Sequence, residues 1–169
     1  CKSSVMLAAI KTPGITTIKA KKSRDHTELL FKELKIPIKI SKNKKYDLIK
    51  IHGPSNFSGF NYNVPGDISS CAFFLVLALL SKKSRIIIKN VNVNISRTGI
   101  IKILNRMNAK IKFKNIKRYK GELIADIFVK NINTLKGINC PEKLNSSAID
   151  EFLIIFLVAA KAKGVSTFR

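Results

Sequence analysis

Acidic residues and metal-binding side chains are scarce in this chain of 169 residues. It has 10 Asp+Glu against 32 Lys+Arg, and only two His and three Cys. His26 and His52 have no cysteine nearby, and Cys1, Cys71 and Cys140 show no metal-ligand spacing. The sequence therefore argues against a zinc site, and three scattered cysteines fit a protein of the reducing cytoplasm.

Long apolar runs and several common motifs are also missing. The runs Ile68–Leu80 and 152–160 are too short to span a bilayer and predict buried helices. There is no phosphate-binding loop of the Gly-x-x-x-x-Gly-Lys-Ser/Thr type, no dinucleotide fingerprint and no Gly-x-Ser-x-Gly elbow. The chain shows no secretory signal, and it starts at Cys1 without Met inside an apparent helix and stops abruptly at Arg169, so we expect a fragment.

The net charge of +22 has two interpretations. Dense Lys and Arg are typical of a nucleic-acid-binding module. Alternatively, 26 of the 32 basic residues are Lys, and Ile and Asn are abundant, which is the mixture expected from an A+T-rich genome. The basic residues are spread along the chain, so we favour the second interpretation, with a positive field that attracts anionic substrates.

The hydrophobic pattern predicts alternating helices and strands. In order, we expect a buried helix ending near residue 10, a strand at 15–19, a helix capped by Ser23 or Asp25, a hairpin of 36–40 and 46–51, a helix at 69–80, a strand at 85–91, an amphipathic helix opened by 97–99, strands at 110–116, 124–129 and 135–138, a helix at 146–163 and a strand at 165–168. The pattern repeats with a period of about 70–80 residues, which predicts an α/β supersecondary unit used more than once. The best domain boundary lies within residues 53–66.

Two adjacent carboxylates, Asp150 and Glu151, directly precede the apolar run 152–160. Negative charge is favoured at a helix start, so both can be ordinary helix-start acids. A carboxylate held there can also serve as a general base. Consecutive helical side chains point about 100° apart, so at most one faces a given site. Asp150 is the better candidate base and Glu151 the better helix-start acid.

Three other polar segments leave alternatives open. Residues 23–28 (Ser-Arg-Asp-His-Thr-Glu) can hold a phosphate beside free N–H groups or form an ordinary capped surface helix. Residues 64–70 (Val-Pro-Gly-Asp-Ile-Ser-Ser) fit a turn plus N-cap better than a phosphate cradle. Residues 110–120 alternate Lys with Ile, Phe and Tyr, as in an RNA-binding strand or a lysine-protected edge strand.

Taken in order, these segments resemble the 5-enolpyruvylshikimate-3-phosphate synthase family, the enolpyruvyl transferases of the shikimate pathway. The resemblance rests on residues 2–9 (Lys-Ser-Ser-Val-Met-Leu-Ala-Ala), 12–17 (Thr-Pro-Gly-Ile-Thr-Thr), 23–28, 64–70 with 72–76 (Ala-Phe-Phe-Leu-Val), 97–99 (Arg-Thr-Gly) and 149–151 (Ile-Asp-Glu). It covers essentially the whole chain. The sister enzyme of peptidoglycan synthesis shares the architecture but matches residues 23–28 and 64–70 less well, and it stays an alternative beside the nucleic-acid-binding module.

The resemblance implies an α/β (α+β) fold built from βαβαββ-type units, the inside-out α/β barrel of the enolpyruvyl transferases. It implies that residues 1–63 are the last unit of one domain and that residues 64–169 are the first one-and-a-half units of the other.

The resemblance also implies the site. Ser23 and Arg24 would bind shikimate 3-phosphate, and Asp150 would contact its 5-hydroxyl as the acid-base residue. The reaction adds that hydroxyl to C2 of phosphoenolpyruvate and releases phosphate, and no metal or organic cofactor is required. We expect a cytoplasmic enzyme, monomeric at full length, with no nucleic-acid or membrane partner.

The chain departs from the family pattern in several places. It lacks the N-terminal Lys and Arg that would bind phosphoenolpyruvate and the downstream Arg-x-Lys-Glu-type segment with the partner acid, so we predict that the chain alone is inactive. Asn108 stands where the family usually has Gly, and residues 34–36 (Leu-Lys-Ile) replace a usual Phe-Gly-Ala. We expect these changes to shift the local turns.

Overall fold

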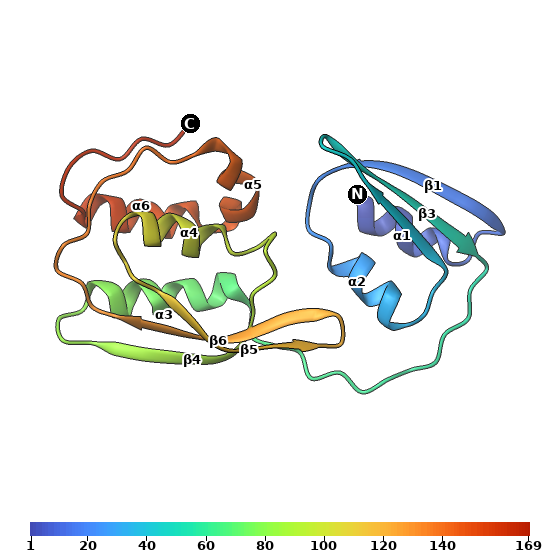
Figure 1. Ribbon diagram of the computed structural model, residues 1–169, viewed down its shortest axis with the longest axis horizontal. Helices are drawn as coiled ribbons and strands as arrows, with labels where there is room; N and C mark the ends of the chain where they lie inside the picture. Colours follow the sequence, from blue (N-terminus) through green and yellow to red (C-terminus); the bar gives the residue numbers. More distant parts are fainter. The chain divides into compact units, whose positions relative to one another are not determined.

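The computed structural model describes residues 1–169 and consists of two compact units (Figure 1). The first comprises Cys1–Asn63 and Lys120–Glu122, and the second comprises Val64–Tyr119 and Leu123–Arg169. The assignment of residues 1–63 and 64–169 to the domains of a longer protein stays a prediction.

The first unit is a three-stranded antiparallel sheet covered by two helices. Its elements are α1 (Lys2–Ala9), β1 (Gly14–Lys21), α2 (His26–Glu33), β2 (Ile38–Lys42) and β3 (Tyr46–Gly53). The strands lie in the order β1-β3-β2, with β3 paired antiparallel to both neighbours. Met6, Phe31, Ile49 and Ile51 form the centre of its core. The predicted hairpin of β2 and β3 is confirmed.

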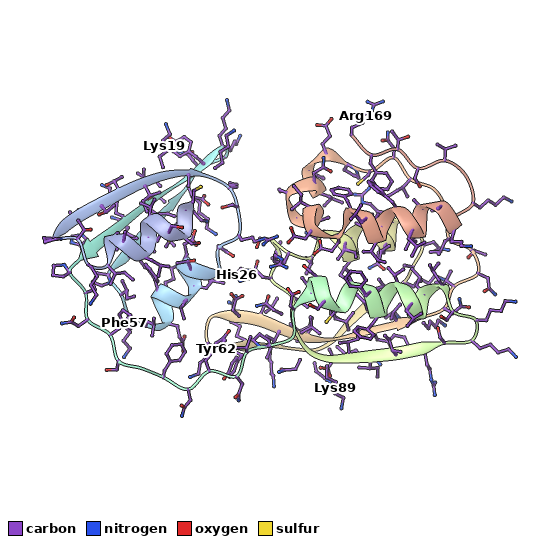
Figure 2. The ribbon with its side chains drawn as sticks, turned by 180° about the vertical axis from the view of Figure 1, so that it is seen from behind. Lys19, His26, Phe57, Tyr62, Lys89 and Arg169 are labelled. Atoms are coloured by element: carbon purple, nitrogen blue, oxygen red, sulfur yellow. The ribbon has the colours of Figure 1, made fainter.

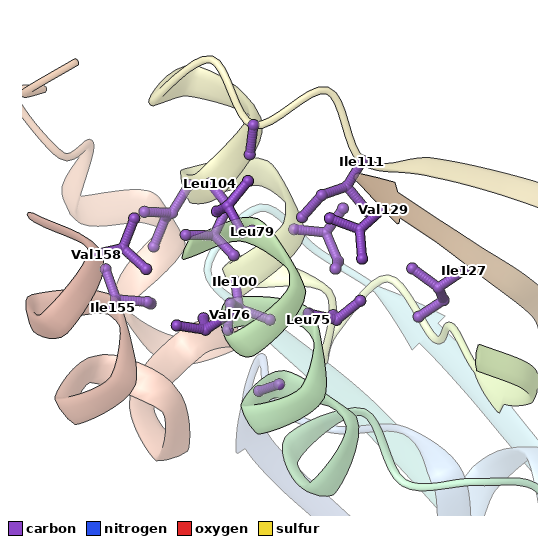
Figure 3. Packing of buried hydrophobic residues seen from close by; sticks show 14 of the residues in the cluster. Leu75, Val76, Leu79, Ile100, Leu104, Ile111, Ile127, Val129, Ile155 and Val158 are labelled. Carbon is purple, nitrogen blue, oxygen red and sulfur yellow. The ribbon is translucent and has the colours of Figure 1, made fainter. Parts of the chain in front are cut away.

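The second unit repeats this plan and then adds a further helical segment. Its elements are α3 (Ile68–Leu80), β4 (Arg85–Asn92), α4 (Gly99–Arg106), β5 (Lys112–Tyr119), β6 (Glu122–Lys130), the 3₁₀ turn η1 (Glu142–Leu144), α5 (Asn145–Ala148), the 3₁₀ turn η2 (Ile149–Glu151) and α6 (Phe152–Lys161). The strand order is β4-β6-β5, with β4 antiparallel to β6. The helices lie on one face of this sheet (Figure 1). Leu75 and Leu79 of α3, Leu104 of α4 and Ile155 and Val158 of α6 pack together in the core (Figure 3).

The predicted α/β repeat is confirmed. Both units run helix, strand, helix, strand, strand, and in both the last strand lies between the other two. The sequence pattern repeats because each unit needs one face of its sheet covered by helices.

The helix predicted over 146–163 is wrong as a continuous element. Ala148 has φ −132° and ψ 11°, far from the helical values near −63° and −42°. This backbone conformation ends the α-helix α5 before η2 begins. Asp150 and Glu151 therefore lie in a 3₁₀ turn, and Glu151 takes the N-cap position of α6. The strands predicted at 135–138 and 165–168 are also wrong, since these segments make only isolated bridges, Lys136 with Lys163 and Asn139 with Thr167.

The most apolar helices are buried on one side only, contrary to the expectation of full burial. In α6, Ile155 and Val158 are buried, while Leu153 and Leu157 are exposed. In α3, the exposed apolar residues are Phe73, Phe74 and Leu77. A helix in this arrangement meets the core along a single stripe, so its other apolar side chains stay at the surface.

The side-chain cap predicted for α2 is wrong. Asp25 occupies the N-cap position, but its side chain makes no capping hydrogen bond. The carboxylate of Glu28, which has capping-box spacing from Asp25, instead pairs with Lys2. A long-range ion pair has replaced the local contact.

Lys35 and Asn108, where the sequence departs from the family pattern, both adopt left-handed backbone conformations, with φ of 56° and 75°. Each follows the C-cap of its helix, Leu34 for α2 and Met107 for α4. Helices commonly end on a left-handed residue, for which Gly is the usual choice. Both helices therefore end on a left-handed residue other than Gly, and the expected shift of these turns relative to the family stays a prediction.

Basic side chains are distributed over both units. Figure 2 shows Lys19 of β1 and Lys89 of β4 projecting outward from their sheets. None of the helices has the length and apolar character needed to cross a membrane.

Candidate functional site

The predicted phosphate-binding residues lie in the first unit. Ser23 and Arg24 are exposed in the loop between β1 and α2. Lys2 of α1 donates a hydrogen bond to the carbonyl oxygen of Arg24 at 2.7 Å and pairs with Glu28 at 2.5 Å. The side chains of Lys2 and Glu28 are almost fully buried. This ion pair ties the loop to both helices, so Ser23 and Arg24 stand on a fixed backbone.

The second unit gathers the other motifs at the N-terminus of α3. Asp67 is the N-cap of α3, where its carboxylate accepts a hydrogen bond from the Ser70 N–H at 2.9 Å. The predicted N-cap within residues 64–70 is thus confirmed, whereas Gly66, expected in a turn, instead forms a parallel bridge with Val91. Desolvation raises the pKa of Asp67, but the Ser70 hydrogen bonds and the nearby Arg97 guanidinium outweigh it and lower that pKa below its ordinary value.

Arg97 lies at the centre of this cluster. It precedes α4, and its Nη2 atom donates to Ser69 Oγ at 2.6 Å and to Asp67 Oδ1 at 3.0 Å. The same nitrogen lies 3.9 Å from Asp150 Oδ2. One cation therefore contacts two carboxylates and a hydroxyl from segments far apart in the sequence.

The adjacent acids Asp150 and Glu151 have different environments. Glu151 is 3% exposed and accepts a hydrogen bond from Ser69 Oγ at 2.5 Å. The side chain of Asp150 is 45% exposed and lies beside Arg97. The 3₁₀ turn thus directs one carboxylate inward and leaves the other accessible to a substrate, as the sequence argument on consecutive side chains requires.

Gly99 allows the helices around this cluster to approach closely. It is buried at the start of α4, and an added Cβ would lie 2.5 Å from the backbone C and O and from Oγ of Ser147 in α5. Because η2 follows α5 directly, this contact sets where the turn with Asp150 begins.

Arg97 and Ser69 also belong to the site, although neither was predicted as a site residue from the sequence. Both were visible in the motifs 97–99 and 64–70, but nothing local showed that they meet. Ser23 and Arg24 belong to the first unit, and Asp150 belongs to the second. No three His, Cys, Asp or Glu side chains gather in an arrangement that could hold a metal ion. The second-unit cluster offers an accessible carboxylate beside a fixed cation, which suits proton transfer.

Known proteins resemble the chain over nearly all of its length. The sequence model of the family EPSP synthase (3-phosphoshikimate 1-carboxyvinyltransferase) matches residues 1–169. The chain is 43% identical over 164 residues to the 3-phosphoshikimate 1-carboxyvinyltransferase of Ruthia magnifica subsp. Calyptogena magnifica, covering 96% of this chain and 37% of that protein. It is 38% identical over 169 residues to the enzyme of the same name from Zymomonas mobilis, covering 99% of this chain and 37% of the relative.

A solved structure shows the same likeness in three dimensions. EPSP synthase from Acinetobacter baumannii superposes with a TM-score of 0.85 at 37% sequence identity, over 98% of this chain and 38% of that one. The chain thus spans well under half the length of the relatives that it matches. On the strength of the family match over all 169 residues, the chain belongs to the EPSP synthase family.

Proposed function

We propose that the chain is part of a 3-phosphoshikimate 1-carboxyvinyltransferase and supplies the base of its reaction. The enzyme transfers the enolpyruvyl group of phosphoenolpyruvate to the 5-hydroxyl of shikimate 3-phosphate, on the route to chorismate and the aromatic amino acids. The observation that carries the proposal is the accessible carboxylate of Asp150, whose Oδ2 lies 3.9 Å from Arg97 Nη2 in this chain. The family match over all 169 residues supports the reaction assigned to it.

The chemistry assigns a role to each predicted residue. Asp150 takes the proton of the 5-hydroxyl as that oxygen attacks C2 of phosphoenolpyruvate, while the partner acid of the full-length enzyme adds a proton to C3. The tetrahedral intermediate then loses phosphate from C2 and a proton from C3, which restores the double bond of the enolpyruvyl group. Such a base contributes about 10²- to 10⁴-fold to the rate. Ser23 and Arg24 bind the phosphate of shikimate 3-phosphate, since a guanidinium and a hydroxyl are suited to an anion of that shape.

The same proposal covers the rest of the enzyme. Its two domains are built from repeated βαβαββ-type units in the inside-out α/β barrel, with the crossing near Val64. The full-length enzyme is a cytoplasmic monomer whose substrates are shikimate 3-phosphate and phosphoenolpyruvate. The excess of basic residues attracts both anions.

The test replaces Asp150 by Asn in the full-length enzyme and measures phosphate release. We expect turnover to fall by about 10²- to 10⁴-fold, since Asn keeps the size of the side chain but cannot accept the proton. The matched control is Asp126→Asn, which alters a carboxylate on β6 that contacts Asn90 and Asn115, and it should leave turnover near its original value. Near-normal turnover of the Asp150 variant would show that the catalytic assignment is wrong.

The substrate assignment has its own test. Ser23→Ala and Arg24→Met should each raise KM for shikimate 3-phosphate by about tenfold or more, because each removes a hydrogen bond to a charged group. An unchanged KM in both variants would contradict this assignment and leave that of Asp150 standing.

A further inference from the structure

On the basis of the function proposed above for Asp150, we propose that Arg97 is a positioning residue: it fixes the 3₁₀ turn η2, and with it Asp150, to the N-terminus of α3 through Ser69 and Asp67. Arg97 itself need not touch either substrate. Its role is to keep the carboxylate of Asp150 where the 5-hydroxyl arrives.

The contacts of Arg97 connect three segments of the second unit. The terminal nitrogen Nη2 has two hydrogens, and Ser69 Oγ and Asp67 Oδ1 accept them at 2.6 and 3.0 Å. The guanidinium charge also lies 3.9 Å from Asp150 Oδ2. The side chain of Arg97 is 16% exposed, against 45% for Asp150, so the carboxylate is the more accessible of the two groups.

Ser69 extends this link to the second acid of the turn. Its hydroxyl accepts from Arg97 and donates to Glu151 Oε1, so one oxygen joins the cation to the buried carboxylate. If the turn rotated, Glu151 would lose a charge-assisted hydrogen bond in a buried setting, which is costly. Asp150 and Glu151 are neighbours on one short turn, so a contact that fixes Glu151 also limits the movement of Asp150.

The backbone around Arg97 is itself fixed. Its N–H donates to the carbonyl of Asn94 at 2.8 Å, and Thr98 and Gly99, which follow it, are buried. The side chain of Arg97 therefore extends from a loop whose backbone is fixed to the capped N-terminus of α3. This is the arrangement expected of a group that orients a catalytic residue, because a displacement of about 1 Å can lower a rate by about 10²-fold.

The experiment measures kcat, KM and the affinity for shikimate 3-phosphate in the full-length enzyme. Arg97→Met should lower kcat by about 10- to 100-fold while KM for both substrates stays near its original value. Arg97→Lys restores the charge but not the reach of the guanidinium, so it should recover part of the lost rate. Arg106→Met is the matched control, because Arg106 lies in the last turn of α4, and it should leave kcat unchanged.

A double-mutant cycle separates positioning from a general effect on the fold. If Arg97 acts only through Asp150, adding Arg97→Met to Asp150→Asn lowers kcat no further. If Arg97→Met lowers kcat by the same factor in the Asp150→Asn variant as in the original enzyme, the inference is overturned. So would a raised KM for phosphoenolpyruvate with kcat unchanged, since Arg97 would then be an anion ligand.

Two further results keep the inference separate from the proposed function and from folding. If Asp150→Asn abolishes turnover while Arg97→Met does not, the inference fails and the function stands. If Asp150→Asn leaves turnover intact, the proposed function fails. If Arg97→Met does not fold, Ser69→Ala replaces it, because it breaks the link to Glu151 and removes only one hydroxyl, and it must lower kcat without changing KM.

Discussion

Replacement of Gly99 by Ala should destabilise the second unit, although Ala is the better helix former. The added Cβ would lie 2.5 Å from three atoms of Ser147, whereas carbon atoms in contact are normally about 3.5–4.0 Å apart. Two of those atoms belong to the backbone of α5, so no side-chain rotation relieves the overlap. The helices α4 and α5 must move apart.

The expected loss follows from two opposing effects. Ala instead of Gly favours a helix by up to about 1 kcal/mol, and less at the first residue of α4. Overpacking of a core costs about 1–3 kcal/mol. The net destabilisation should be about 1–2 kcal/mol, which raises the equilibrium constant for opening by about 5- to 30-fold.

The buried cysteines of the second unit provide the assay. Cys71 and Cys140 are buried in its core, and desolvation raises the pKa of both thiols. In a Cys1→Ser background, which removes the exposed thiol, the rate of modification by a disulfide reagent in dilute urea reports the opening of this unit. Gly99→Ala should react about 5- to 30-fold faster.

Gly66→Ala is the matched control. Its added Cβ would lie 3.7 Å from the nearest atoms, an ordinary contact, so the rate should stay the same or fall slightly. Equal rates for Gly99→Ala and the original protein would refute the close approach of α4 and α5.

Two other predictions concern the helix ends. Lys35→Gly should raise the free energy of unfolding by about 0.5–1 kcal/mol because it relieves a left-handed backbone, whereas Asn108→Gly should show no such gain, since Asn108 Nδ2 also donates to Thr134 at 3.1 Å. Urea midpoints from circular dichroism would check both, and a larger gain at Asn108 than at Lys35 would contradict the reasoning. At the start of α3, the pKa of Asp67 is lowered in the folded state, so the unfolded chain binds its proton first as the pH falls. The stabilisation by Asp67 is present above the unfolded-state pKa near 3.8 and is lost as the pH falls through the folded-state value. Asp67→Asn keeps a capping oxygen and should therefore lose less stability than the original protein between pH 7 and pH 3; equal losses would show that this carboxylate does not contribute.

The hydrophobic pattern of the sequence predicted most helices and strands, because these elements depend on interactions between residues close together in the chain. Alternation predicted the hairpin of β2 and β3, a continuous apolar run predicted α3, and helical spacing predicted the amphipathic α4. The break at Ala148 was not predictable in this way, since Ser, Ala and apolar residues all tolerate a continuing helix. The family could be recognised from motifs alone, since their order along the chain needs no coordinates.

The sequence by itself determined the repeated α/β plan, the family and the candidacy of Asp150. Only the tertiary structure decided which groups surround that carboxylate. Arg97 and Ser69 stand 53 and 81 residues before Asp150 and reach it or its neighbour only because α3, α4 and η2 pack together. Hydrogen bonds act over about 3 Å, so a contact between distant segments depends on the packing of the whole unit and leaves no trace in local periodicity.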